Sequence, residues 1–159
     1  MRFVIQRVSS ASVDVDGKTI GKIGRGFLVL IGVCDEDTEE TCAKMVKKML
    51  GLRIFPDSEG KTNLDLDAVD GEVLLISQFT LYADCRHGNR PSFIKAGSPD
   101  HAEKLYDHIC SLCSSALGEK NGKNRAERGS FGADMKVSLV NDGPFTVILD
   151  SDEIIGNRH

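Results

Sequence analysis

Apolar and polar residues alternate, with interruptions, along residues 3–15. Alternation with a period of two is typical of a strand that buries one face. The pair Asp16-Gly17 then favours a tight hairpin turn, so residues 18–23 are predicted to return as the partner strand. Residues 27–33 form a continuous apolar run, which predicts a strand buried on both faces.

Two later segments repeat apolar residues every three or four positions, which predicts helices with one buried face. The first begins with acidic residues at 37–40 and ends at Leu50, with Gly51 expected just after it. The second has Ser98 as its N-cap, Pro99 in its first turn, and ends near Leu117 before Gly118. Its buried stripe is predicted to be Ala102, Leu105, Ile109, Leu112, Cys113 and Ala116.

The segments between and after the helices are predicted to be strands and loops. Residues 72–82 begin apolar and turn polar from Ser77 onward, which indicates a strand whose far end opens onto a site. Residues 84–97 have no periodicity, and a loop of this length is more often functional than idle. The other predicted pieces are a short strand at 52–55, a turn at 56–60, a polar link at 119–124, and strands at 125–131, 135–140 and 145–150.

Residues 141–146 lie between two of these strands and are predicted to connect them as a hairpin. Asp142-Gly143 can supply a two-residue turn without help from its neighbours. Pro144 removes one ladder N–H and makes the Gly143-Pro144 bond eligible for the cis form. Two interpretations remain open: an ordinary hairpin loop, or a rigid tip without side chains whose carbonyl oxygens read the stereochemistry of a ligand.

The order of the elements predicts a mixed α/β fold. Two helices that each need one face covered, together with a majority of strands, fit layered twisted β-sheets with both helices packed on one side. At 159 residues, the chain is expected to form one domain over its whole length, 1–159.

The charge of the chain is negative overall but unevenly distributed. The net charge of −4 argues against a broad nucleic-acid surface. Residues 84–128 carry eight Lys or Arg against six Asp or Glu, so this segment is +2 and the remainder is −6. The pattern fits either a small contact with a nucleic-acid end or ordinary solvated loops. The basic residues concerned are Arg86, Arg90, Lys95, Lys120, Lys123, Arg125 and Arg128.

The termini and cysteines indicate the compartment. Residues 1–7 contain charges among the apolar positions, so neither a signal peptide nor a membrane span is predicted there, and a cytoplasmic location is expected. Five cysteines, an odd number, fit reduced thiols. Cys110 and Cys113 form a C-x-x-C inside the second helix without a second pair, so we expect a structural role and no metal site. His101 and His108 are expected to be exposed.

The sequence offers hydroxyl side chains as candidate catalytic groups. It places no obvious base beside them. In a strand, Thr80 would share a face with Gln78 and Tyr82. A Thr nucleophile needs a partner that takes its proton, and the sequence fixes none nearby. From these residues, Thr80 is either a strand hydroxyl or a catalytic group.

Two stretches together change this picture. Ser77-Gln78-Phe79-Thr80-Leu81-Tyr82 and Asn141-x-Gly143-Pro144-x-Thr146, at this spacing, resemble the two signature motifs of the D-aminoacyl-tRNA deacylases. Residues 6–8, 90–93 and 131–135 also match the family's pattern. The resemblance therefore covers the whole chain.

The resemblance implies a cytoplasmic homodimer that hydrolyses the ester between a D-amino acid, or glycine, and the 3′-terminal adenosine of tRNA, without a cofactor. A cis Gly143-Pro144 tip of one subunit would enter the active site of the other and reject L side chains by collision. The Phe79 and Thr80 N–H groups would stabilise the oxyanion. The remaining implied substrate-binding or supporting residues are Ser77, Gln78, Asn141, Thr146 and Arg7, with Arg7 either bracing the tip or forming a surface ion pair.

Several alternatives stay open at this point. Within the family, either the Thr80 hydroxyl attacks directly or a water does so with help from the RNA 2′-hydroxyl. Outside it, the chain is a nucleic-acid-binding module without catalysis, or a hydrolase of a non-RNA ester.

Overall fold

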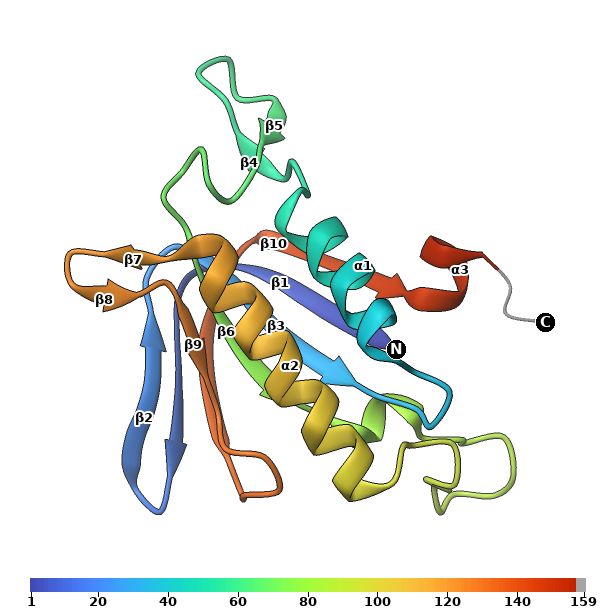
Figure 1. Ribbon diagram of the computed structural model, residues 1–159. Coiled ribbons are helices and arrows are strands. Elements are labelled where there is room, and N and C mark those ends of the chain that lie inside the picture. The colour runs from blue at the N-terminus through green and yellow to red at the C-terminus, as the bar shows by residue number, and fades with distance from the viewer. Residues whose placement is uncertain (157–159) are drawn as a thin grey trace.

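A computed structural model describes residues 1–156. Its centre is a six-stranded sheet in the order β10-β1-β3-β6-β9, with β2 paired to the far half of β1 (Figure 1). The β3–β6 and β6–β9 pairs are parallel, and the pairs that involve β1 are antiparallel. The strands are β1 (Arg2–Val15), β2 (Lys18–Ile23), β3 (Gly26–Gly32), β6 (Glu72–Ser77), β9 (Ala126–Arg128) and β10 (Lys136–Asp150).

The two long helices lie on one face of this sheet, as predicted (Figure 1). Helix α1 (Glu39–Leu50) is capped by Thr38, and α2 (Pro99–Leu117) ends at Gly118, whose φ is +67°. Both helices bury their apolar sides in the same core as Phe27, Val29 and Ile31 of β3. The predicted mixed α/β class is therefore confirmed. The buried stripe of α2 differs from the predicted one, because Ala116 is exposed, whereas Tyr106, Cys110 and Leu117 are buried.

The opposite face of the sheet is covered by β-structure. The far half of β1 bends away with β2, so that Val13 and Ile23 enclose Leu28 and Leu74 in a second core. Strand β3 has Phe27 and Val29 on the helix side and Leu28 on the other, and all three are fully buried. This confirms the prediction of a strand buried on both faces.

The predicted hairpin at 141–146 is wrong. Strand β10 continues through these residues and pairs with β1 on both sides of them. Gln6 lies opposite Thr146, and Val8 lies opposite Asn141, so four residues of β10 bulge outward opposite Arg7 alone. Because β1 is 14 residues long, it offers a partner to both halves of β10, and no turn is needed.

The predicted strand at 72–82 is also wrong in its second half. Strand β6 ends at Ser77, and Phe79–Tyr82 form a short 3-10 helix, η1. The alternation of faces therefore does not extend to Thr80 and Tyr82.

Smaller differences concern the edges of the fold. The strand predicted at 52–55 is β4 (Phe55–Pro56), which pairs with β5 (Thr62–Leu64), and the strand predicted at 125–131 is the shorter β9. The polar link contains a small hairpin of β7 (Glu119–Lys120) and β8 (Lys123–Asn124), and a short C-terminal helix α3 (Ser151–Ile155) was not predicted. Within residues 1–156, no helix is long and apolar enough to cross a membrane.

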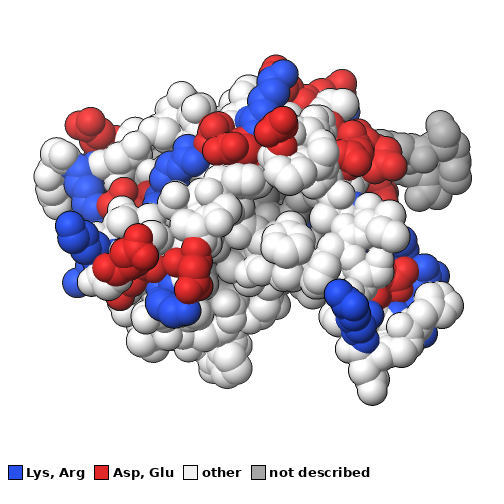
Figure 2. All heavy atoms as spheres, turned by 90° about the horizontal axis from the view of Figure 1, so that it is seen from below, with Lys and Arg blue, Asp and Glu red and all other residues white. Residues whose placement is uncertain are grey.

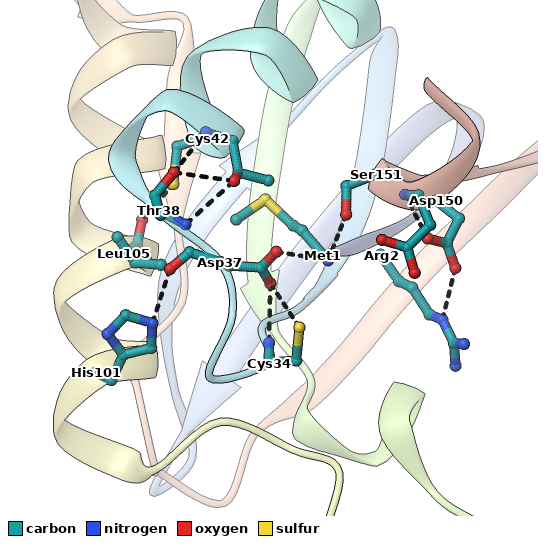
Figure 3. A network of polar contacts seen from close by, with 12 residues as sticks. Met1, Arg2, Cys34, Asp37, Thr38, Cys42, His101, Leu105, Asp150 and Ser151 are labelled. Atoms are coloured by element: carbon teal, nitrogen blue, oxygen red, sulfur yellow. Dashed lines mark hydrogen bonds and ion pairs between the residues drawn. The ribbon is translucent and has the colours of Figure 1, made fainter. Parts of the chain in front are cut away.

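A buried polar network fixes the start of β1 (Figure 3). The Met1 ammonium group is fully buried and donates to Asp37 Oδ1 at 2.9 Å and to Ser151 Oγ at 2.8 Å. Asp37 Oδ2 accepts from the Cys34 N–H at 2.9 Å. His101 was expected to be exposed, but it is half-buried and its Nε2 lies 3.0 Å from the Asp37 carbonyl oxygen. The network joins β1 to the loop that precedes α1, to α2 and to α3.

Candidate active site

A cavity of about 680 Å³ opens where β6 ends. This volume is within the range of small-molecule sites. Its walls come from the end of β6, the loop before α2, the first turns of α2, and residues 131–137. Figure 2 views this end of the molecule and shows a largely uncharged surface between two charged regions.

Ser77, Gln78 and Phe79 all line this cavity. Phe79 is 57% exposed, and its ring meets the ring of Phe93 edge-on, with centroids 5.0 Å apart. An exposed aromatic pair at the mouth of an apolar cavity is suited to stacking on a flat ring. Phe131 and Tyr106 form the deeper wall.

Thr80 is exposed beside the cavity and does not line it. Its Oγ accepts a hydrogen bond from Gln78 Nε2 at 2.5 Å. An amide N–H cannot take up a proton, so this partner does not activate the hydroxyl as a nucleophile.

The Phe79 and Thr80 backbone N–H groups begin η1. The first backbone hydrogen bond of this turn is made by the Leu81 N–H to the Gln78 carbonyl, at 3.3 Å. Among the described residues, the two preceding N–H groups have no backbone acceptor, as expected for the first donors of a helix. They are free to donate to an incoming oxygen atom.

Residues 141–146 form a braced, exposed tip, and the Gly143-Pro144 bond is cis. Asn141 holds the tip together because its Oδ1 accepts from the Phe145 N–H at 2.7 Å and its Nδ2 donates to Thr146 Oγ1 at 3.1 Å. Asn141 and Thr146 are thus bonded to the tip itself. Gly143 has a φ of +143°, and an added Cβ would lie 2.9 Å from the Phe145 nitrogen.

Arg7 supports the tip from β1. Its Nε donates to the Asp142 carbonyl at 2.9 Å, its Nη1 donates to the Ile54 carbonyl at 2.6 Å, and its guanidinium lies 4.6 Å from the centroid of Phe145. The side chain is only 12% exposed, and the nearest oxygen of the Asp142 carboxylate is 3.9 Å away. The contacts with carbonyls and the ring dominate over ion pairing.

The two motif stretches contact β1 at different positions, η1 at the first residue of the strand and the tip near its middle. Arg2 Nη1 donates to the Leu81 carbonyl in η1 at 2.9 Å, whereas Arg7 supports the tip. Arg2 and Arg7 are five positions apart in an extended strand, which corresponds to about 16 Å. Gly143 and Pro144 therefore do not line the cavity of their own chain.

The basic residues at 120–128 do not form an open cationic surface. Lys120 pairs with Asp70, Lys123 with Glu72, and Arg128 with Asp107. Arg125 is buried, with Nε on the Gly71 carbonyl and Nη1 on both the Leu117 carbonyl and Asp67. The expectation of a contact with a nucleic acid is wrong for Arg125, which is buried. Lys120 and Lys123 are exposed, Arg128 is half-buried, and all three form ion pairs within the chain.

The cysteines of the C-x-x-C are packed in the core. Cys110 and Cys113 are buried and free. Burial raises the pKa of Cys110 to about 11 and that of Cys113 to about 12, which disfavours thiolate chemistry. Cys85 is exposed in the loop that precedes α2.

Two residues that support the site were missed from sequence. Arg2 holds the Leu81 carbonyl and lies 4.7 Å from the centroid of Tyr82. Tyr106 lines the cavity and donates to the Leu75 carbonyl at 2.7 Å. Tyr106 follows Ala102 by four positions, so the helical period could have placed it on the buried side. Arg2 carries no such signal, because its partner is distant in the chain.

Known proteins match this chain over nearly its full length. Residues 4–150 match the model of the D-Tyr-tRNA(Tyr) deacylase family. The D-aminoacyl-tRNA deacylase of Desulfatibacillum aliphaticivorans is 54% identical over 95% of this chain and 99% of the relative. That of Thermosipho africanus is 51% identical over 97% of this chain and 99% of the relative.

Solved structures give the same result for the fold. A c-Myc DNA unwinding element binding protein superposes with a TM-score of 0.84 at 39% identity, over 94% of this chain and 98% of that chain. A probable eukaryotic D-amino acid tRNA deacylase superposes with a TM-score of 0.80 at 21% identity, over 93% and 97%. The fold, the cavity and these relatives define a hydrolase that acts on aminoacyl esters of tRNA. The chain belongs to the D-aminoacyl-tRNA deacylase family.

Proposed function

We propose that the cavity at the end of β6 binds the 3′-terminal adenosine of a D-aminoacyl-tRNA, so that the ester bond lies at η1. The observation that carries the proposal is the placement of Ser77, Gln78 and Phe79 on the wall of an apolar cavity in a chain of this family. The adenine ring would stack on Phe79 and Phe93, which expose their faces and edges at its mouth. Ser77 and Gln78 supply polar groups for the ribose and base.

Hydrolysis would use water as the nucleophile. Attack on the ester carbonyl develops a negative oxygen, and the free N–H groups of Phe79 and Thr80 would donate to it. The RNA 2′-hydroxyl, adjacent to the ester, would help to orient the water. The bond between the carbonyl carbon and the ribose 3′-oxygen then breaks, this oxygen takes up the proton lost by the water, and the free amino acid and tRNA are released. Direct attack by Thr80 is disfavoured because its bonded neighbour is the Gln78 amide, which is not a base.

Chiral selection would come from a second copy of the chain. The Gly143-Pro144 tip is exposed, braced from behind, and remote from its own cavity, so it is suited to entering the cavity of a partner in a homodimer. Its backbone would collide with an L side chain, whereas a D side chain would point away. Glycine has no side chain to collide, so glycyl-tRNA would be a substrate. The cytoplasm is the proposed location.

The first test is hydrolysis of D-tyrosyl-tRNA and L-tyrosyl-tRNA by the purified protein. Loss of the D ester with the L ester intact is expected, and glycyl-tRNA should be hydrolysed as well. Equal hydrolysis of D and L esters would contradict the chiral role of the tip and favour a general esterase.

The second test addresses the shared site. Phe79→Ala and Gly143→Ala chains, carrying different C-terminal tags, would be produced separately and together. Each alone is expected to be impaired, whereas the mixed dimer contains one intact cavity facing one intact tip and should recover activity. A mixed dimer no more active than its parents would refute the exchange of tips.

A non-catalytic nucleic-acid-binding module is the second candidate, favoured by the structural likeness to the c-Myc DNA unwinding element binding protein. It predicts affinity for tRNA or DNA independent of aminoacylation, with a steep dependence on salt. The internal pairing of Lys120, Lys123 and Arg128 leaves little open cationic surface for this role. Binding without deacylation would favour it.

A further inference from the structure

We propose that residues 84–97, which we name the rim loop, bind the phosphates of the nucleotides that precede the terminal adenosine, with Arg90 as the main contact. This inference rests on the proposed function, because it assumes that the adenosine occupies the cavity. It adds a binding site for the RNA strand outside that cavity.

The base of the rim loop is firmly attached to the cavity. Asp84 and Ser92 exchange backbone hydrogen bonds of 2.7 and 2.9 Å, and the Gly97 N–H donates to the Val33 carbonyl at 2.8 Å. Phe93, which follows the bridge, is part of the cavity wall. Residues 85–91 are therefore closed into a loop whose base adjoins the cavity wall.

The rim loop carries excess positive charge. It contains Arg86, Arg90 and Lys95 against one acid, Asp84. Asp84 accepts from Arg86 at 2.6 Å and lies 3.5 Å from Lys95. In Figure 2 the loop forms the lobe at lower right, where basic side chains surround an acidic one.

Arg90 differs from the other basic residues of the loop. It is exposed, and within residues 1–156 its side chain makes no hydrogen bond, ion pair or ring contact. A guanidinium without an internal partner is available for a phosphate, which it can bind through two parallel N–H groups. The adjacent Arg86 and Lys95 share one carboxylate and leave a net positive field around it.

Residues 131–137, which supply another part of the cavity wall, carry one basic residue, Lys136. There, Asp134 is paired with Lys136 at 3.1 Å. The other basic stretch, at 120–128, is neutralised or buried, as described above. Of the basic stretches within residues 84–128, only the rim loop therefore offers an exposed arginine without an internal partner, which favours a path of the RNA strand over it.

The test compares two D-tyrosyl esters that share the terminal adenosine, D-tyrosyl-tRNA and 3′-O-D-tyrosyl-adenosine; only the first carries the preceding nucleotides and their phosphates. For Arg90→Ala, KM for the tRNA ester is expected to rise about tenfold with kcat unchanged, because a contact to a distant phosphate stabilises ground state and transition state equally. The slope of log kcat/KM against log salt concentration for the tRNA ester should become shallower, by about the amount that corresponds to one lost phosphate contact. Hydrolysis of the adenosine ester should be unchanged.

Two further variants complete the experiment. Arg90→Glu should weaken tRNA hydrolysis more than Arg90→Ala and again spare the adenosine ester. Lys104→Ala removes one exposed charge from α2, and it should leave both substrates unaffected.

The outcomes are distinguishable. An equal effect of Arg90→Ala on both esters, or none on either, would overturn the phosphate contact while leaving the proposed function intact. Failure of the unmodified protein to hydrolyse both esters would overturn the proposed function, and the rim-loop site with it.

Discussion

Two arginines on β1 support the two halves of the candidate site, Arg2 at the start of the strand and Arg7 near its middle, and their surroundings differ. Arg2 holds the Leu81 carbonyl and lies over Tyr82, and Arg7 holds the Asp142 carbonyl and lies over Phe145. Each thus fixes the backbone of one motif and contacts an aromatic ring of the same motif.

The surroundings of the two arginines differ. Arg2 is 42% exposed and forms a close ion pair with Asp150, next to the buried network of Met1 and Asp37. Arg7 is 12% exposed and is bonded to two carbonyl oxygens of separate segments. The Arg2 end is therefore stabilised by charge and core contacts, whereas the shape of the tip depends on Arg7.

The largest expected effect is at the Arg2 end, on stability. Asp37→Asn leaves the buried Met1 ammonium without its carboxylate, and breaking a buried pair in this way costs about 3 to 5 kcal/mol. Urea unfolding should report this loss. Glu103→Gln, an exposed change on α2, is the control and should alter stability by less than about 0.5 kcal/mol. A similar small effect for Asp37→Asn would contradict the importance of the network.

The next effect is at the tip, on activity. Gly143→Ala would place a Cβ 2.9 Å from the Phe145 nitrogen and 3.3 Å from Arg7 Nη2, so the tip must move. We expect deacylation of D-tyrosyl-tRNA to fall about a hundredfold or more, since small misplacements of positioning groups have effects of this size. Gly17→Ala also places a side chain at positive φ (+76°) but has no atom within 4 Å, and should lower stability without this loss of activity. Equal activity in both variants would contradict the role of the tip.

Replacing each arginine by lysine should distinguish the two halves of the candidate site. Arg7→Lys cannot reach both the Asp142 and Ile54 carbonyls, because an ammonium lacks the planar fork. Activity is expected to fall about tenfold to a hundredfold, in line with one or two lost hydrogen bonds. Arg2→Lys retains an ion pair with Asp150, and its activity should fall only a few-fold. Equal losses of deacylation activity in initial-rate measurements would show that Arg2 and Arg7 do not differ in this way.

The hydroxyl of Thr80 is expected to matter less. Thr80→Ala removes the acceptor of the Gln78 amide but keeps the backbone N–H that is proposed to face the oxyanion. Deacylation should fall by less than about tenfold. A loss of about a thousandfold or more, the scale of removing a nucleophile, would instead establish direct attack by Thr80.

The smallest effect concerns acid stability at the Arg2 end. Burial opposes ionisation of Asp150, but the Asp152 N–H and the Arg2 guanidinium together hold the pKa of this carboxyl below its ordinary value of 3.8. The stabilisation is therefore present above pH 3.8 and is lost as the pH falls through the lower pKa of the folded state. Asp150→Asn should have a melting temperature less sensitive to acid than the unmodified protein. Identical sensitivity of the two melting temperatures would show that this ion pair does not contribute to the pH dependence of stability.

The sequence was informative wherever neighbouring residues decide the outcome. The period of apolar residues predicted α1 and α2, and the apolar run 27–33 predicted a strand buried on both faces. The two motif stretches identified the family. These features depend on spacing along one segment, which the sequence contains in full.

The errors share a cause in contacts between distant segments. Asp142-Gly143 is good turn chemistry, but the length of β1 lets both halves of β10 pair with it, so the residues become a bulge. Ser77 to Tyr82 looks like continuing strand, yet the Gln78 N–H bonds to Ile31 and the chain then turns into η1. Local propensity is weak beside pairing and packing of this kind.

The charged residues show most clearly which properties the sequence determines and which depend on the tertiary structure. The sequence by itself determined which segments carry Lys and Arg, and it determined the fold class and the motifs. Only the tertiary structure decided that Arg125 is buried against Asp67 and Gly71, and that Arg90 is exposed in the rim loop without a partner among residues 1–156. The reason is physical: whether a charge is available depends on acids and carbonyls that the fold brings within about 4 Å, from positions tens of residues away in the chain.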